Sequence, residues 1–196
     1  MTDDWQEKLI DEILDLELAM FMTVPSRGPA PCREHPDSFR LMRRAQFESW
    51  SENTLKHYLA DLKAAGQRNE NLMTLKYARM ENLVPLANDS PLIDRIVEIQ
   101  ADWHREVARK YPYFSRTSRP VDDSSDRSGS VSFSTYIRGE LETYSNRTLA
   151  SLYDDMQTVK GRGGNMAEDI FNRIVQARGF ESLDEAERRL RAKHGH

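Results

Sequence analysis

The strongest constraint on the fold of this chain is an internal repeat. A shift of 94 positions matches polar and apolar residues without a gap. The matched pairs include Ser38 with Ser132, Glu48 with Glu142, Asp61 with Asp155, and Asn71 with Asn165. A second shift, of 83 positions, places residues 9–13 on residues 92–96. Because polar identities match in an ungapped frame, we interpret about 5–83 and about 91–178 as two diverged copies of one helical unit, related by a pseudo-twofold axis.

Apolar residues recur at the spacing of an α-helix through most of the chain, and no alternating strand pattern competes with it. The sequence therefore predicts an all-α fold, a single helical bundle domain over residues 1–196 built from two three-helix repeats. The expected helices cover about 5–22, 38–65 with a bend near residues 51–53, 71–83, 91–110, 132–160 and 165–178, with a short C-terminal helix over about 182–193. Residues 113–131 are rich in Ser, Arg, Asp, Pro and Gly and are expected to form a long, mobile surface segment.

The composition limits the classes of partner. The formal net charge is -4 and no long basic run is present, so we expect no nucleic-acid partner. No apolar run approaches the ~20 residues of a membrane span, so we expect no membrane partner. The single cysteine, Cys32, excludes an internal disulfide and favours a reducing compartment, which predicts a cytoplasmic location. Cys32 is also a candidate nucleophile, because Arg33 and His35 would favour its thiolate.

Two surface motifs are interpreted as structural. Residues 161–165, Gly-Arg-Gly-Gly-Asn, precede a predicted helix as a phosphate-binding loop does, but they lack its Lys-Ser/Thr ending. Their counterpart at residues 66–68 favours a turn between helices. The second motif is a pair of charged residues four positions apart, which predicts solvated ion pairs on the outer face. These pairs are Arg44 with Glu48 and Arg138 with Glu142.

Successive residues of an α-helix lie ~100° apart around its axis. On this basis, several polar residues of the predicted helices fall on the same face as the apolar residues. They are Glu17, Arg43, Gln46, Gln100, His104 and Glu140. Burying such groups costs several kcal/mol unless hydrogen bonds or opposite charges satisfy them. We therefore expect them to meet between the two copies, with Arg43 paired to a carboxylate and the glutamines bridging. A network that only fixes helix packing and a ligand site are both compatible with this pattern.

The two copies differ in their cationic residues. The first copy carries Arg43, Lys76, Tyr77 and Arg79 where the second has Ile137, Ile170, Phe171 and Arg173. This asymmetry suits an anionic or zwitterionic ligand, and it equally suits a surface with scattered bases. A metal site is the weaker hypothesis, because the Glu-x-x-His spacing of di-iron helical proteins does not occur. If the chain did bind a metal, we would expect a single ion held by Glu17, His104 and Glu140.

Two functional hypotheses follow. The first is a small-molecule-binding helical protein, with or without catalysis, whose site lies between the copies. Glu17 and Glu140 would be its acid/base groups. Its ligand-binding residues would be Arg43, Gln46, Gln100, His104, Trp50, Lys76, Tyr77, Arg79 and Tyr144. The alternative is a non-catalytic regulatory or protein-interaction module whose buried polar network is structural. The sequence names no cofactor, and it leaves open whether the protein is an enzyme.

Motifs along nearly the whole chain resemble an uncharacterised family, domain of unknown function number four-one-two-five. The motifs include Glu17-Leu-x-Met20-Phe21, Phe39-x-x-Met42-Arg43-x-x-Gln46-Phe47-x-x-Trp50, and Phe133-x-x-Tyr136-x-Arg138-Gly139-Glu140-Leu141. The family pattern includes Glu17, Arg43, Gln46, Gln100 and Glu140 and has an apolar residue where this chain has His104. The resemblance implies the helical fold and the polar centre, and it implies no known activity.

Overall fold

The computed structural model describes residues 4–25, 35–116, 118–122 and 131–194. Within these ranges every regular element is a helix and no strand occurs, which confirms the all-α prediction. The helices are α1 (Asp4–Met22), α3 (Pro36–Phe47), α4 (Glu52–Gln67), α5 (Leu72–Met80), α6 (Pro91–Lys110), α7 (Pro112–Ser115), α8 (Phe133–Leu141), α9 (Asn146–Gly161), α10 (Met166–Ala177) and α11 (Leu183–His194). No helix of the described ranges is long and apolar enough to span a membrane.

The two long helices expected at residues 38–65 and 132–160 are each broken into two. The break falls at Ser51 in the first and at Ser145 in the second, where the backbone is extended. Each serine hydroxyl accepts a hydrogen bond from the backbone N–H three residues later, which starts a new helix. Each of the two proposed copies therefore contains four helices rather than three. The spacing of apolar residues runs on across the break, so periodicity alone did not reveal it.

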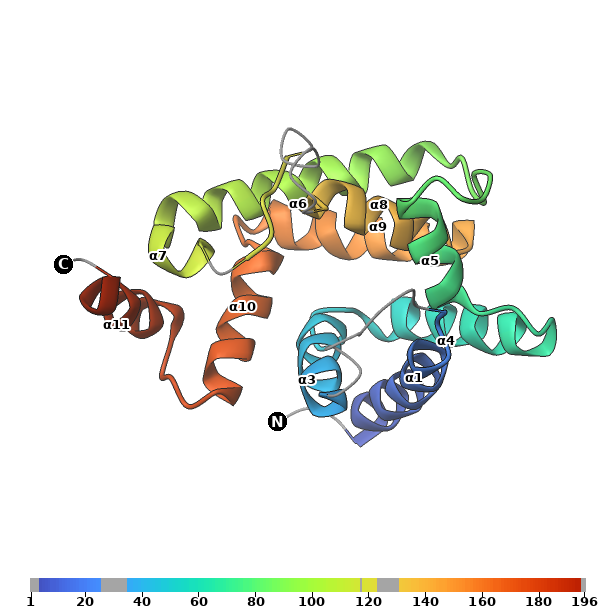
Figure 1. Cartoon of the computed structure of the whole chain (residues 1–196), viewed down its shortest axis with the longest axis horizontal. Helices are drawn as coiled ribbons and strands as arrows, with labels where there is room; N and C mark the ends of the chain where they lie inside the picture. Colours follow the sequence, from blue (N-terminus) through green and yellow to red (C-terminus); the bar gives the residue numbers. More distant parts are fainter. Residues whose placement is uncertain (1–3, 26–34, 117, 123–130, 195–196) are drawn as a thin grey trace.

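The two groups of helices pack face to face (Figure 1). The first group has α1 against α3, α4 and α5, and the second has α6 against α8, α9 and α10. The groups meet where α4 packs on α9. In addition, α5 packs on α8 and α10 packs on α3, so the last helix of each group crosses to the other. Gly139 permits the close approach of α8 to α5, because a Cβ at this position would lie 3.1 Å from the carbonyl oxygen of Lys76.

Equivalent residues of the two proposed copies make equivalent contacts. Asp155 accepts hydrogen bonds from the Ser51 N–H (2.9 Å) and the Thr54 hydroxyl (2.6 Å). Asp61 accepts the same two bonds, at the same lengths, from Ser145 and Thr148. The amides of Asn71 and Asn165 donate to the carbonyls of Met20 and Trp103, and the Phe21–Phe39 stack has its counterpart in His104–Phe133.

Two pairs of equivalent positions also touch one another, as residues beside a twofold axis would. They are His57 with Ser151 (3.1 Å) and Trp50 with Tyr144 (ring centroids 6.2 Å apart). These contacts support the hypothesis of a duplicated unit, and the pseudo-twofold relation stays a prediction.

One hydrophobic core runs through both groups of helices. The short helices α7 and α11 cover the end of this core beside α10. The carboxylate of Glu187 on α11 accepts hydrogen bonds from the N–H groups of Tyr113 and Phe114. Part of the segment expected to be mobile, at residues 113–131, is therefore helical and held in place. Residues 117 and 123–130 of that segment lie outside the described ranges.

Candidate functional site

Four of the six predicted inward polar residues meet around Arg43, and they are Glu17, Arg43, Gln46 and Glu140. Arg43 comes from α3 and is 6% exposed. Its Nε donates to Glu17 Oε2 at 2.8 Å, and a second nitrogen, Nη2, pairs with Glu17 Oε1. The other terminal nitrogen, Nη1, donates to Glu140 Oε1 and to Gln46 Oε1, both at 2.8 Å. The guanidinium therefore joins carboxylates from α1 and α8, one from each group of helices.

Glu140 receives two further donors. Lys76 Nζ lies 2.5 Å from its Oε2, and the Tyr144 hydroxyl donates to its Oε1 at 2.6 Å. Glu17 likewise accepts from the Tyr58 hydroxyl, at 2.5 Å. We call Glu17, Arg43, Gln46, Tyr58, Lys76, Glu140 and Tyr144 the buried ion network.

Sequence reasoning missed two residues here, Tyr58 and Tyr136. Tyr58 lies on the buried face of α4, and a phenol hydroxyl on such a face needs a hydrogen-bond partner. That requirement is the signal that would have found it. Tyr136 presents its ring to Lys76, whose Nζ lies 3.6 Å from the ring centroid. The position of Tyr136 in the sequence does not distinguish it from an ordinary residue that packs beside the site.

The charges of the network balance. Burial alone would lower the pKa of Arg43, but the carboxylates of Glu140 and Glu17 outweigh burial and raise it well above its ordinary value. Burial would raise the pKa of Glu140, but Arg43 and Lys76 hold it below its usual range. Burial and the neighbouring carboxylates raise the pKa of the Tyr58 and Tyr144 hydroxyls. Two cations thus face two carboxylates, and both phenols keep their protons at neutral pH.

The network is closed. Every fully buried polar side-chain atom of the described residues has a hydrogen-bond partner. Two hollows are lined by α6 and its neighbours, and neither touches Arg43, Glu17 or Glu140. The arrangement therefore has fixed internal partners for its charges.

Other predicted site residues lie away from the network. Gln100 contacts the sulfur of Met156 (4.0 Å). His104 stacks on Phe133, with ring centroids 3.7 Å apart, and its burial lowers the pKa to about 4. Tyr77, by contrast, borders the network: its ring centroid lies 5.8 Å from Lys76 Nζ, and it packs in a small apolar cluster with Phe21.

Arg79 pairs with Glu142, which is 3% exposed. The expected surface pair of Arg138 with Glu142 is therefore wrong, and Arg138 pairs instead with Asp94 at 2.7 Å. Glu48 lies 3.5 Å from Arg173, and Arg44 pairs with Asp11. Trp50 packs edge-on against Tyr58 and Tyr144, as a wall of the network.

The hypothetical metal site does not form from the proposed residues. Arg43 lies between Glu17 and Glu140, and the ring of His104 packs against Phe133. Across the described residues, no group of three or more His, Cys, Asp or Glu side chains could hold a metal ion. Cys32 lies outside the described ranges.

Helices alone, sharing one core with an ion network at its centre, place the chain in the all-α class. It belongs to the family described as Protein of unknown function (DUF4125), whose model matches residues 7–188. A search of curated proteins and a search of solved structures each found no match.

Proposed function

We propose that the chain is a non-catalytic binding module and that its buried ion network is structural. In this proposal the network holds the two groups of helices in one packing arrangement, and recognition of partners takes place on the surface. The observation that carries the proposal is the complete internal pairing of the network: Arg43 and Lys76 face Glu17 and Glu140, and each is at most 6% exposed.

The placement of the residues supports a packing role. Glu17, Arg43 and Lys76 come from α1, α3 and α5 of the first group, and Glu140 comes from α8 of the second. The bonds from Arg43 and Lys76 to Glu140 therefore cross between the groups. Helices that slid by one turn would leave these charges buried without partners, at a cost of several kcal/mol per ion.

The protonation states support the same role. A general acid or base works best when its pKa lies near the operating pH. In this network the pKa of Glu140 is lowered and those of Tyr58 and Tyr144 are raised, so all three move away from neutrality. The small-molecule site predicted between the copies stays a hypothesis. It requires α1, α3, α5 and α8 to separate enough to admit a ligand against Arg43.

The test replaces Glu140 with glutamine. Arg43 and Lys76 would then lack their shared counter-charge, and we expect the free energy of unfolding to fall by ~3–5 kcal/mol. Urea denaturation followed by circular dichroism measures the change. Glu52→Gln is the matched control, because Glu52 pairs with Lys56 on the surface, and its loss should cost ~1 kcal/mol or less.

A second variant separates a packing role from a chemical one. Glu17→Gln, Arg43→Ile, Lys76→Ile and Glu140→Gln together install the residues of the matched positions, Gln100, Ile137, Ile170 and Gln46. We expect this neutral variant to recover much of the stability that Glu140→Gln loses, because no unpaired charge remains. A Glu140→Gln protein as stable as the wild type would contradict the proposal, since the carboxylate would then be dispensable for packing.

A further inference from the structure

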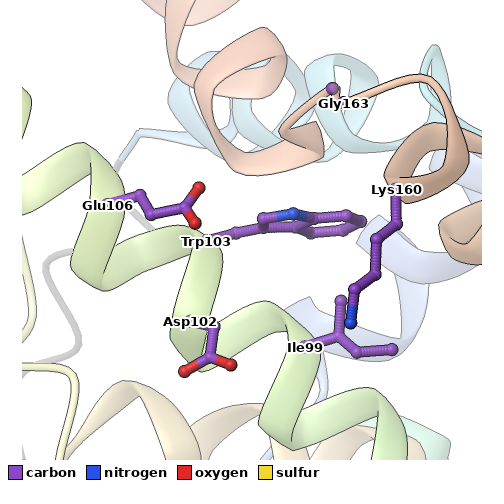
Figure 2. A pocket seen from close by; sticks show the side chains of 7 residues that line it. Ile99, Asp102, Trp103, Glu106, Lys160 and Gly163 are labelled. Carbon is purple, nitrogen blue, oxygen red and sulfur yellow. The ribbon is translucent and has the colours of Figure 1, made fainter.

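A hollow of about 220 Å³ lies where α6 meets the turn between α9 and α10. Figure 2 shows the indole ring of Trp103 between two acidic side chains, Asp102 and Glu106, and the basic side chain of Lys160. Ile99, Gly163 and Gly164 complete the lining. At ~30 Å³ for each water molecule, the space holds ~7 waters, which suits a small organic ligand.

The hollow presents hydrogen-bond donors without partners. No described residue pairs with the ammonium of Lys160 or accepts from the indole N–H of Trp103. Trp103 is only 5% exposed. Because every fully buried polar atom of the described residues has a partner, this N–H must reach solvent. The ammonium of Lys160, beside Ile99 in Figure 2, is suited to a carboxylate.

Acceptors stand at the other end of the hollow. Glu106 uses one carboxylate oxygen to accept from the Asn165 amide (2.9 Å), and Asp102 uses one to accept from Arg105 (2.7 Å). The amide of Asn165 also donates to the Trp103 carbonyl, at 3.1 Å, so the turn is fixed against α6. The second oxygens of both carboxylates have no protein donor in the described part of the chain, which suits a ligand ammonium group.

The turn leaves room at the indole. Gly163 has φ +70°, a conformation that favours glycine, and a Cβ there would meet nothing within 4 Å. A Cβ on Gly164 would lie 3.0 Å from a side-chain carbon of Val159, so the backbone approaches closely at that point. The backbone thus passes over the hollow without a side chain that fills it.

The first copy lacks this chemistry at the matched positions. The shifts of 83 and 94 replace Asp102, Trp103, Glu106 and Lys160 with Ala19, Met20, Thr23 and Gly66. The supporting asparagine is present in both, and Asn71 donates to the Met20 carbonyl as Asn165 does to that of Trp103. The turn therefore forms without the polar side chains, and their presence in the second copy is not needed for the fold.

We propose that the hollow beside Trp103 binds a free α-amino acid, with its carboxylate at Lys160 and its ammonium at Glu106 and Asp102. Both charges of the ligand match the charges of the hollow, and the two protein carboxylates disfavour a dianion. The inference rests on the proposed function, because it places recognition on the surface and not at the buried ion network.

The test is a titration of ¹⁵N-labelled protein with L-alanine. The chain has three tryptophans, so its indole region contains three signals, and Trp103→Phe identifies the one from Trp103. We expect this signal to shift and saturate. N-acetyl-L-alanine lacks the ammonium and L-alaninamide lacks the carboxylate, and neither should bind comparably.

Two variants test the assigned groups. Lys160→Gln and Glu106→Gln should each raise the Kd for L-alanine about ten-fold, the loss expected for one charged hydrogen bond. Glu70→Gln, in the matched turn of the first copy, should leave the Kd unchanged. No saturable shift at up to about 50 mM L-alanine would overturn the inference. Equal binding of the two blocked analogues, or insensitivity to both variants, would also overturn it. Failure of the proposed function would show instead in the unfolding of Glu140→Gln, which does not involve this hollow.

Discussion

Arg43 uses all three nitrogens of its guanidinium within the ion network. Nε and Nη2 pair with Glu17, and Nη1 donates to Glu140 and Gln46. This planar fork suits arginine to the position, because the single nitrogen of a lysine could not make the paired bonds to Glu17 and also donate to Glu140 and Gln46. Lys76, which needs to reach only Glu140, serves as a point charge.

Another single residue, His104, is expected to make the free energy of unfolding depend on pH. Its burial lowers the pKa from 6.5 to about 4, so it stays neutral in the folded protein while the unfolded chain takes up a proton. The free energy of unfolding should therefore fall as pH drops from ~6.5 toward ~4. Between pH 7 and pH 5 this residue should account for a loss of about 2 kcal/mol.

His104→Phe, which copies Phe21 at the matched position, should remove that part of the pH dependence. Urea denaturation of both proteins at pH 7 and pH 5 measures the difference, and other groups cancel in the comparison. Parallel losses of stability in the two proteins would show that His104 does not titrate in this way.

The residues of the ion network could be predicted because a helix of known phase fixes which side chains face inward. Glu17, Arg43, Gln46 and Glu140 were found in this manner, and they do meet. Gln100 and His104 have the same phase but lie beside Met156 and Phe133 instead. The angular position of a residue around its helix shows that its side chain points inward. It does not show which part of the neighbouring helix that side chain meets, so contact between two inward residues could not be deduced.

Between elements, the reciprocal bonds of Asp61 and Asp155 fasten α4 to α9. Each aspartate accepts from the first backbone N–H and the hydroxyl that begin the other helix. We expect Asp61→Asn and Asp155→Asn each to lower the free energy of unfolding by ~1–3 kcal/mol, because a charged acceptor is lost. Since the bond lengths match, the two losses should be similar.

Thermal denaturation of the two single variants and of the double variant measures these losses. The surface change Asp15→Asn is the control, because its partner Arg40 is on the solvent side. A loss confined to one aspartate would contradict the proposed equivalence of the two copies.

Matched polar residues predict two copies of one unit, which stays a prediction, and they do not reveal that α5 and α10 cross between the groups. Sequence similarity shows that two segments share a structure, and it carries no information on which copy each helix contacts. The break at Ser51 was expected only as a bend, and the break at Ser145 was missed, since the apolar spacing continues through the caps.

At the scale of the whole molecule, the crossed helices join the two halves. α5 packs on α8 and α10 packs on α3, so neither half completes its packing alone. We expect a protein divided between residues 86 and 87, in the segment that links α5 to α6, to assemble from two co-expressed fragments. The fragments should co-elute in size-exclusion chromatography.

A split between residues 150 and 151, within α9, is the matched comparison and should not assemble, because it cuts a helix at the centre of the core. Separate elution of the fragments divided between residues 86 and 87 would show that the crossed helices do not hold the halves together.

The crossed arrangement also has a consequence during synthesis. When α5 leaves the ribosome, the α8 surface on which it packs has not yet been translated, so Lys76 still lacks Glu140 and Met80 still lacks the close contact with Gly139. The nascent chain must hold an incomplete unit until about sixty further residues have emerged, several seconds at ordinary rates of translation. Over that interval the exposed helix is a natural target for chaperones.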